Sequence, residues 1–175
     1  MRKQLGRYTE TEKREMIERV RETALDNEKA ITGCARSVAH ALYEHLGLGN
    51  EEVIQGLAPF SGGTARTGSM CGAVVGGVTG MGLAFAPNQL RGASKLPGYN
   101  KSFDLAWVFC DRFKERFGSL VCREVHHSLF GCSWNLRDLQ DREDFFKPEI
   151  HDKCAEVVGE AAALAAEIIL ENQGD

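Results

Sequence analysis

Several well-known functional motifs are missing from this sequence. Its 175 residues include six cysteines, but there is no CxxC, no CxxCH and no zinc-ribbon or zinc-finger spacing. Covalent haem attachment is therefore excluded. The segment from Gly63 to Gly68 has P-loop spacing but lacks the following lysine. No hydrolase triad, Rossmann fingerprint or HExxH is present, so redox chemistry is the one enzymatic activity with any support, and whether the protein is an enzyme stays open.

The chain also lacks a basic face and a long apolar run. Its net charge is −4, and no basic run contains interleaved aromatic residues, which argues against a nucleic-acid partner. The first sixteen residues have no apolar core of a secretory signal. The most apolar stretch, residues 70–86, is shorter than the ~20 residues that a membrane-spanning helix needs. We therefore expect a cytoplasmic protein without a membrane span, in which standing disulfides are not expected.

Helical periodicity is present along almost the whole chain. A composition of 43% hydrophobic and 26% charged residues suits one domain over residues 1–175. No segment alternates with the period of a strand, so we predict an all-α, single-domain helical bundle of about six helices. The principal helices are expected over residues 10–25, 31–46, 70–85, 102–117, 119–130 and 149–172, with a short helix over 50–57. The segment over 132–148 is polar and irregular, with room for one or two helical turns.

The helix predicted over residues 70–85 is rich in glycine. Ser69 precedes it as a candidate N-cap. Gly72, Gly76 and Gly80 recur every four residues and share one face, although each glycine costs ~1 kcal/mol of helix propensity relative to alanine. We expect another backbone or a bulky group to pack closely against this glycine face.

Three of the six cysteines fall near the start of a predicted helix: Cys71, Cys122 and Cys154. The unpaired N–H groups and the helix dipole at such positions favour a thiolate and lower the thiol pKa. Cys34 lies inside a predicted helix and faces the core. Cys132 follows a glycine in a loop and is interpreted as incidental, with a spare ligand or resolving thiol as the alternative.

Cys110 belongs to the apolar stripe of the helix predicted over 102–117, with Ser102 as its cap. The stripe comprises Phe103, Ala106, Trp107, Cys110, Phe113 and Phe117. A thiol in the middle of such a stripe behaves as a small buried hydrophobe.

Other polar residues allow weaker predictions. His126 follows Cys122 by four residues, so it is a candidate ligand or proton partner of that thiol, or simply a hydrogen-bonded histidine. His40, His45 and His151 are interpreted as surface residues. Arg66 and Ser69, before the glycine-rich helix, form a candidate anion site.

Four segments together resemble the C_GCAxxG_C_C family of redox-active proteins. They are "GCARSVAHAL" at 33–42, "SMCGAVVGGVTGMGL" at 69–83, "RFGSLVCREV" at 116–125 and "KCAEVVGEAAALAAEII" at 153–169. The resemblance covers about residues 30–170 and places the family cysteines at Cys34, Cys71, Cys122 and Cys154. A related domain of split-Soret cytochromes is associated with an iron–sulfur centre, whereas the haem-attachment part of those proteins has no counterpart here.

The resemblance leaves three hypotheses open. In the first, the four cysteines converge on a metal centre for electron transfer. A [2Fe–2S] or [4Fe–4S] cluster is favoured, and tetrahedral zinc is the alternative. In the second, they form a metal-free dithiol/disulfide system, with pairs such as Cys34–Cys71 or Cys122–Cys154. In the third, the protein is a helical binding module with buried structural cysteines. A redox partner is implied by the first two but not identified, and a homodimer is compatible with the sequence without being required.

Overall fold

The structure is a computed structural model that describes residues 8–173, and over this range it is built from helices. The expectation of an all-α protein is confirmed. Eight α-helices are present in the described residues, more than the six expected, because short polar segments also fold as helices. For example, the Asp138 side chain accepts hydrogen bonds from the Gln140 and Asp141 N–H groups and so starts a seven-residue helix in the polar segment for which one or two helical turns were predicted. The helices are α1 (Glu10–Ile31), α2 (Cys34–Leu46), α3 (Glu51–Gly56), α4 (Gly72–Phe85), α5 (Tyr99–Phe117), α6 (Cys122–Phe130), α7 (Leu139–Phe145) and α8 (Pro148–Glu171), with 3₁₀ helices at Ala58–Phe60 and Ala93–Lys95.

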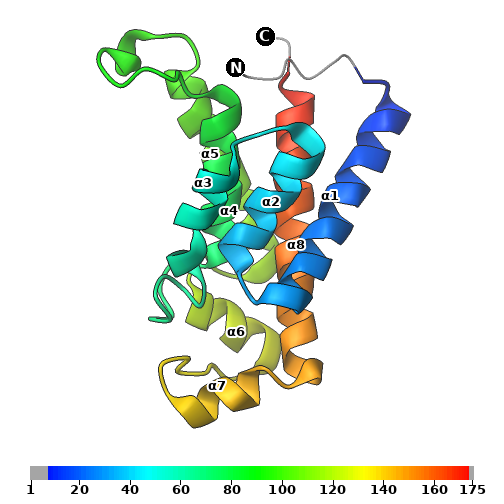
Figure 1. Ribbon diagram of the computed structural model, residues 1–175, viewed down its shortest axis with the longest axis vertical. Helices are drawn as coiled ribbons and strands as arrows, with labels where there is room; N and C mark the ends of the chain where they lie inside the picture. The colour runs from blue at the N-terminus through cyan, green and yellow to red at the C-terminus, as the bar shows by residue number, and fades with distance from the viewer. Residues whose placement is uncertain (1–7, 174–175) are drawn as a thin grey trace.

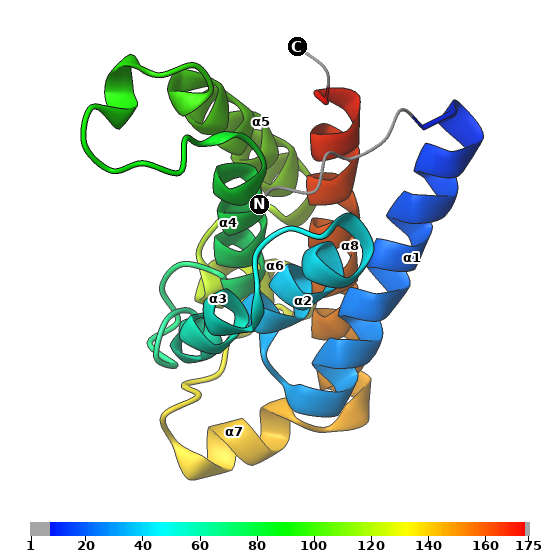
Figure 2. The same ribbon diagram turned by 45° about the horizontal axis from the view of Figure 1, so that its top comes forward.

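Helix α8 is the element around which the others pack. It contacts α1, α2, α4 and α5. Many of its buried side chains are alanines, which lets several helices approach it closely; they are Ala155, Ala161, Ala162, Ala163, Ala165 and Ala166. Helices α6 and α7 lie at one end of the bundle, the lower end in Figure 1; in the turned view of Figure 2, α7 is at the bottom and α6 is seen behind α2 and α4. Within residues 8–173, no helix is both long and apolar enough to cross a membrane.

The glycines of α4 allow close contact on two sides. A Cβ at Gly76 would lie 2.7 Å from the Val38 Cβ and 2.8 Å from the Ala35 carbonyl oxygen, both on α2. A Cβ at Gly80 would contact Leu42 of the same helix, and a Cβ at Gly77 would overlap the Phe109 ring of α5. The glycine face is therefore filled by α2, and the neighbouring Gly77 accommodates a core aromatic ring.

The apolar stripe predicted for α5 is wrong in part. Phe103 and Trp107 are 61% and 69% exposed, whereas Phe109 and Phe113 are fully buried. The space above Gly77 draws Phe109 into the core and sets the rotation of the helix, which turns Trp107 outward. Cys110 is consequently half-buried rather than enclosed.

Ser69 and Ser102, which were predicted to cap helices, do not occupy the N-cap positions, and neither does Ser119 before α6. Helix α5 begins earlier, after Gly98, and the Ser102 hydroxyl inside its first turn donates to the Tyr99 carbonyl at 2.7 Å. Helix α6 begins at Cys122, and the Ser119 hydroxyl instead accepts from the Val121 N–H at 3.0 Å in the preceding turn. Ser69 lies three residues before Gly72, the first residue of α4.

Candidate metal centre

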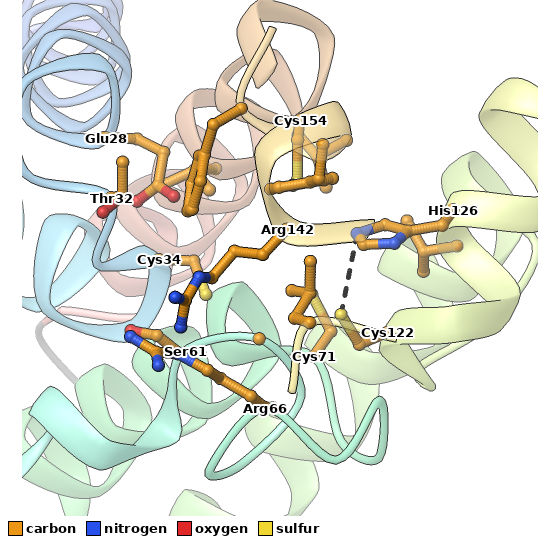
Figure 3. A pocket seen from close by; sticks show the side chains of 17 residues that line it. Glu28, Thr32, Cys34, Ser61, Arg66, Cys71, Cys122, His126, Arg142 and Cys154 are labelled. Atoms are coloured by element: carbon orange, nitrogen blue, oxygen red, sulfur yellow. Dashed lines mark hydrogen bonds between the residues drawn. The ribbon is translucent and has the colours of Figure 1, made fainter. Parts of the chain in front are cut away.

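The four family cysteines surround one cavity at the lower end of the bundle. Cys34, Cys71, Cys122 and Cys154 all line a space of about 80 Å³. Figure 3 shows them approaching this pocket from four different helices or helix starts, beside His126, Glu28 and Arg142. The cavity can hold several atoms, because a single water needs roughly 10–15 Å³ on the same scale.

Backbone pairing brings the starts of α4 and α6 together. Met70 and Val121 form an isolated antiparallel β-bridge. The Cys71 N–H donates to the Leu120 carbonyl at 2.9 Å, and the Cys122 N–H donates to the Ser69 carbonyl at 2.6 Å. Because residues 69–71 are engaged in this pairing, Ser69 cannot cap the helix. The same bonds position Cys71 and Cys122 beside one another at the cavity.

Gly72, the residue after Cys71, makes room for another cysteine. A side-chain carbon at this position would overlap the Cys34 sulfur and approach the Phe60 carbonyl oxygen to 2.8 Å. In the CGAxxG motif, Cys71 is thus a candidate ligand, and the missing side chain of Gly72 leaves room for a second candidate ligand, Cys34. The last glycine of the motif, Gly76, sets the close approach of α2, and this approach brings the start of α2 to the cavity.

The loop before α4 forms another wall of the cavity. Five successive residues, 62–66, have positive φ angles between 51° and 70°, a left-handed turn that includes three residues other than glycine. A Cβ at Gly63 would lie 2.7 Å from the Cys122 Cβ, so the loop backbone presses directly against that cysteine. Such a conformation costs of order 1–3 kcal/mol per non-glycine residue, and it is characteristic of functional sites.

The helix positions of two cysteines differ from those predicted. Cys34 is the first residue of α2 and not an interior one, because α1 continues to Ile31 and delays the start of the next helix. Cys154 lies in the second turn of α8, since this helix begins at Pro148. Three cysteines do stand at helix starts, but they are Cys34, Cys71 and Cys122.

The prediction of lowered thiol pKa values is wrong. Burial raises the pKa of Cys71 and of Cys122 to about 12, and it raises the pKa of Cys34 and Cys154 as well. Backbone N–H groups act in the opposite direction, from Gly62 and Ala35 on Cys34 and from Ala73 and Val74 on Cys71, but desolvation outweighs them. The sulfurs also disfavour each other's charge, so these groups are thiols unless a cation compensates them.

His126 is buried beside Cys122. Its Nε2 lies 3.7 Å from the Cys122 sulfur, a sulfur hydrogen bond drawn in Figure 3, and the residue is 3% exposed. The ring stacks on Phe145 with centroids 4.9 Å apart and contacts Trp134 edge-on. Burial lowers its pKa to about 4, so the imidazole is neutral at pH 7. Its Nδ1 is buried without a hydrogen-bond partner in the described structure, which favours the tautomer with the proton on Nε2 directed at the sulfur.

The remaining predicted residues are divided between the cavity and the surface. Arg66 lines the cavity, but Ser69 does not, and both are exposed. Cys132 is an exposed loop residue and Cys110 lies on α5; neither lines the cavity.

Two residues that line the cavity, Glu28 and Arg142, and His151 next to Glu28 were not found from the sequence. Glu28 is buried, accepts a hydrogen bond from Ser37 and lies 3.7 Å from His151, which is itself buried and not at the surface as predicted. The burial of Glu28 could have been inferred from the sequence, because Glu28 continues the four-residue spacing of Val20 and Ala24, which are both buried. Arg142 of α7 also lines the cavity, and no sequence pattern indicated it.

Metal-binding geometry is not preformed. Within residues 8–173, no group of three or more histidine, cysteine or acidic side chains is arranged to hold a single metal ion. All six cysteines are free thiols. The four sulfurs thus face a common space rather than a common point.

Fold and site together define a helical protein built around a buried four-cysteine cavity. The chain belongs to the family described as "Putative redox-active protein (C_GCAxxG_C_C)", whose model matches residues 32–168. This span contains all four cavity cysteines. No curated protein and no solved structure matches the chain.

Proposed function

We propose that Cys34, Cys71, Cys122 and Cys154 together hold an iron–sulfur cluster and that the protein is an electron-transfer protein. The observation that carries the proposal is the convergence of four thiols, 32 to 51 residues apart in sequence, around one cavity. Four cysteine thiolates are the usual ligand set of [2Fe–2S] and [4Fe–4S] clusters, which when bound supply one-electron transfer.

The size of the cavity favours a cluster over a single zinc ion. Tetrahedral zinc needs four sulfurs about 2.3 Å from one point. The sulfurs of this protein instead surround a space of about 80 Å³, and no three ligands meet at a point in the described residues. A group of several atoms fits this arrangement with less movement of the helices.

The surroundings suit negatively charged thiolates once a cation is present. The N–H groups that act on Cys34 and Cys71 favour the thiolate form. Arg66 and Arg142 line the same cavity and add positive charge. His126 directs Nε2 at the Cys122 sulfur, and hydrogen bonds to ligand sulfurs are one determinant of a cluster's reduction potential.

Anaerobic reconstitution with iron and sulfide tests the proposal. We expect a visible charge-transfer spectrum, with iron and sulfide bound in the wild type and in the Cys110→Ser and Cys132→Ser controls. Alanine at any of the four cavity cysteines should abolish or strongly reduce it. A protein that stays colourless after reconstitution, or one that binds stoichiometric zinc in place of iron under competition, would contradict the proposal.

A metal-free dithiol is the second candidate, and one observation favours it. The bridge between Met70 and Val121 brings Cys71 and Cys122 together, which makes them the pair that the backbone favours. Mild oxidation followed by mass spectrometry would then show a Cys71–Cys122 disulfide in preference to other pairs. If all thiols are still alkylated independently after oxidation, no disulfide has formed, and the result would favour the third hypothesis, a binding module with structural cysteines.

A further inference from the structure

A second, larger cavity adjoins the cysteine-lined one. It has a volume of about 430 Å³ and is formed by the end of α1, the start of α2, the Ala58–Phe60 helix and the following loop. Thr32, Ser61 and Arg66 line both cavities. A volume of this size lies within the range of about 300–1,000 Å³ that is typical of small-molecule sites.

The charge of this second cavity is entirely positive. Arg36 and Arg66 line it, and no aspartate or glutamate does. Neither arginine has an ion-pair partner among the described residues, in contrast to Arg21, Arg112 and Arg116. The nearby carboxylate of Glu28 faces the cysteine-lined cavity and is engaged by Ser37.

A buried donor in the wall has nothing to bind. The Nε of Arg36 is shielded from solvent and has no hydrogen-bond partner in residues 8–173. An unsatisfied buried donor costs about 1–3 kcal/mol, and more when it is charged. Because this nitrogen is shielded from water, an anion in the cavity meets Arg36 through the terminal N–H groups of its guanidinium, which are not shielded and have no hydrogen-bond partner in residues 8–173.

The start of α2 adds to the positive potential. This 13-residue helix has no side-chain cap at Gly33 and no acidic residue in its first turn. Its dipole therefore favours a negative group at the cavity. Arg66 approaches from the left-handed loop, and Figure 3 shows its side chain beside Ser61.

We propose that this cavity, the Arg36–Arg66 pocket, binds a small molecule through a carboxylate or phosphate group held between the two guanidinium groups. Arginine suits both groups because its planar fork can make two parallel hydrogen bonds to an oxyanion. The site differs from the predicted pair of Arg66 and Ser69, since Ser69 does not line the pocket. The two cavities share a wall, so a molecule anchored here lies next to the cysteines. Binding itself does not depend on whether those cysteines hold a cluster.

Titration of the purified protein with inorganic phosphate and, separately, with succinate tests the site by calorimetry. We expect saturable one-to-one binding of at least one anion, and the stronger of the two identifies the anchoring group. Arg36→Gln and Arg66→Gln should each weaken it about tenfold or more, the loss expected for one charge-assisted contact. Arg91→Gln, which removes an exposed charge on the loop before α5, is the matched control and should bind as the wild type does.

Two results would overturn the proposal. One is an absence of saturable binding of either anion to folded protein, as judged by circular dichroism. The other is equal weakening in the Arg91 control and in the pocket variants, which would indicate a general charge effect. Arg36→Lys keeps the charge without the fork, and its weakened binding would show that the geometry matters. Because iron content is not the readout, failure here and failure of the cluster proposal can be told apart.

Discussion

At the scale of single residues, burial decides the chemistry of the cysteines. A helix start alone would favour thiolates, and three cysteines do occupy such positions. Removal from water nevertheless dominates, and it raises the pKa of Cys71 and Cys122 to about 12. The cavity cysteines are therefore suited to bind a cation and poorly suited to act as free nucleophiles.

This contrast predicts the order in which thiols react. In reduced, metal-free protein at pH 8, iodoacetamide should modify exposed Cys132 first and the four cavity cysteines slowest, because the reactive species is the thiolate and access is blocked. Mass spectrometry of timed samples measures the order. Modification of Cys71 or Cys122 before Cys132 would contradict it, and unfolding in urea should equalise all six rates.

The burial of His126 leads us to predict a loss of folding stability in acid. Its pKa falls from an ordinary 6.5 to about 4 in the folded metal-free protein. Above pH 6.5 the residue is neutral in both states. Between pH 6.5 and 4 only the unfolded chain takes up the proton. The free energy of unfolding therefore decreases as the pH is lowered through this range, by about 3 kcal/mol in total.

Urea unfolding between pH 7 and 4 measures this effect. The His126→Phe variant should lose that part of the pH dependence, since phenylalanine can stack on Phe145 without titrating. His127→Phe changes an exposed neighbour and should keep the dependence. Identical pH profiles for all three proteins would show that His126 does not titrate as described.

At the scale of elements, the glycines of α4 serve the packing of α2 and α5. Their spacing in the sequence indicated one close-packed face, but not which helix fills it. The contacts at Gly72 and Gly76 tie this face to the position of Cys34, because both touch the first turns of α2. Helix packing and cavity geometry therefore depend on the same residues.

Two alanine substitutions in α4 should have opposite effects. Gly76→Ala should destabilise the protein by about 1–3 kcal/mol, because its Cβ would crowd Val38 and the Ala35 carbonyl. A Cβ at Gly82 would meet no neighbour within 4 Å apart from the adjoining backbone of its own helix, so Gly82→Ala should stabilise the helix by up to about 1 kcal/mol. Urea unfolding measures both, and a neutral Gly76→Ala would mean that α2 can shift freely.

At the scale of the whole molecule, the cavity exists only in the folded chain. The cysteines are 37, 51 and 32 residues apart, so the unfolded chain holds no comparable site. Whatever they bind should therefore stabilise the fold. The lower end of the bundle, where α6 and α7 lie, is where this stabilisation would act (Figure 1).

Removal of the proposed cluster from reconstituted protein should lower the melting temperature. A ligand at one hundred times its Kd stabilises the folded state by about 2.7 kcal/mol, or roughly 5–10 °C for a chain of this size. Differential scanning calorimetry of reconstituted and chelator-treated protein measures the difference, which Cys71→Ala should abolish and Cys110→Ser should preserve. Equal melting temperatures with and without iron would contradict the binding of iron by these cysteines in the folded protein.

The sequence by itself determined the all-helical class, several helix ends, the family and the four cysteines that belong together. These properties are local, because they rest on helical periodicity and on short motifs. Tertiary structure alone decided the rest. Which face of α5 is buried, the deep position of His151, the raised pKa values of the cysteines and the presence of Arg36 and Arg66 in one pocket all depend on neighbours distant in the chain. Burial and desolvation come from those neighbours, and no local pattern encodes them.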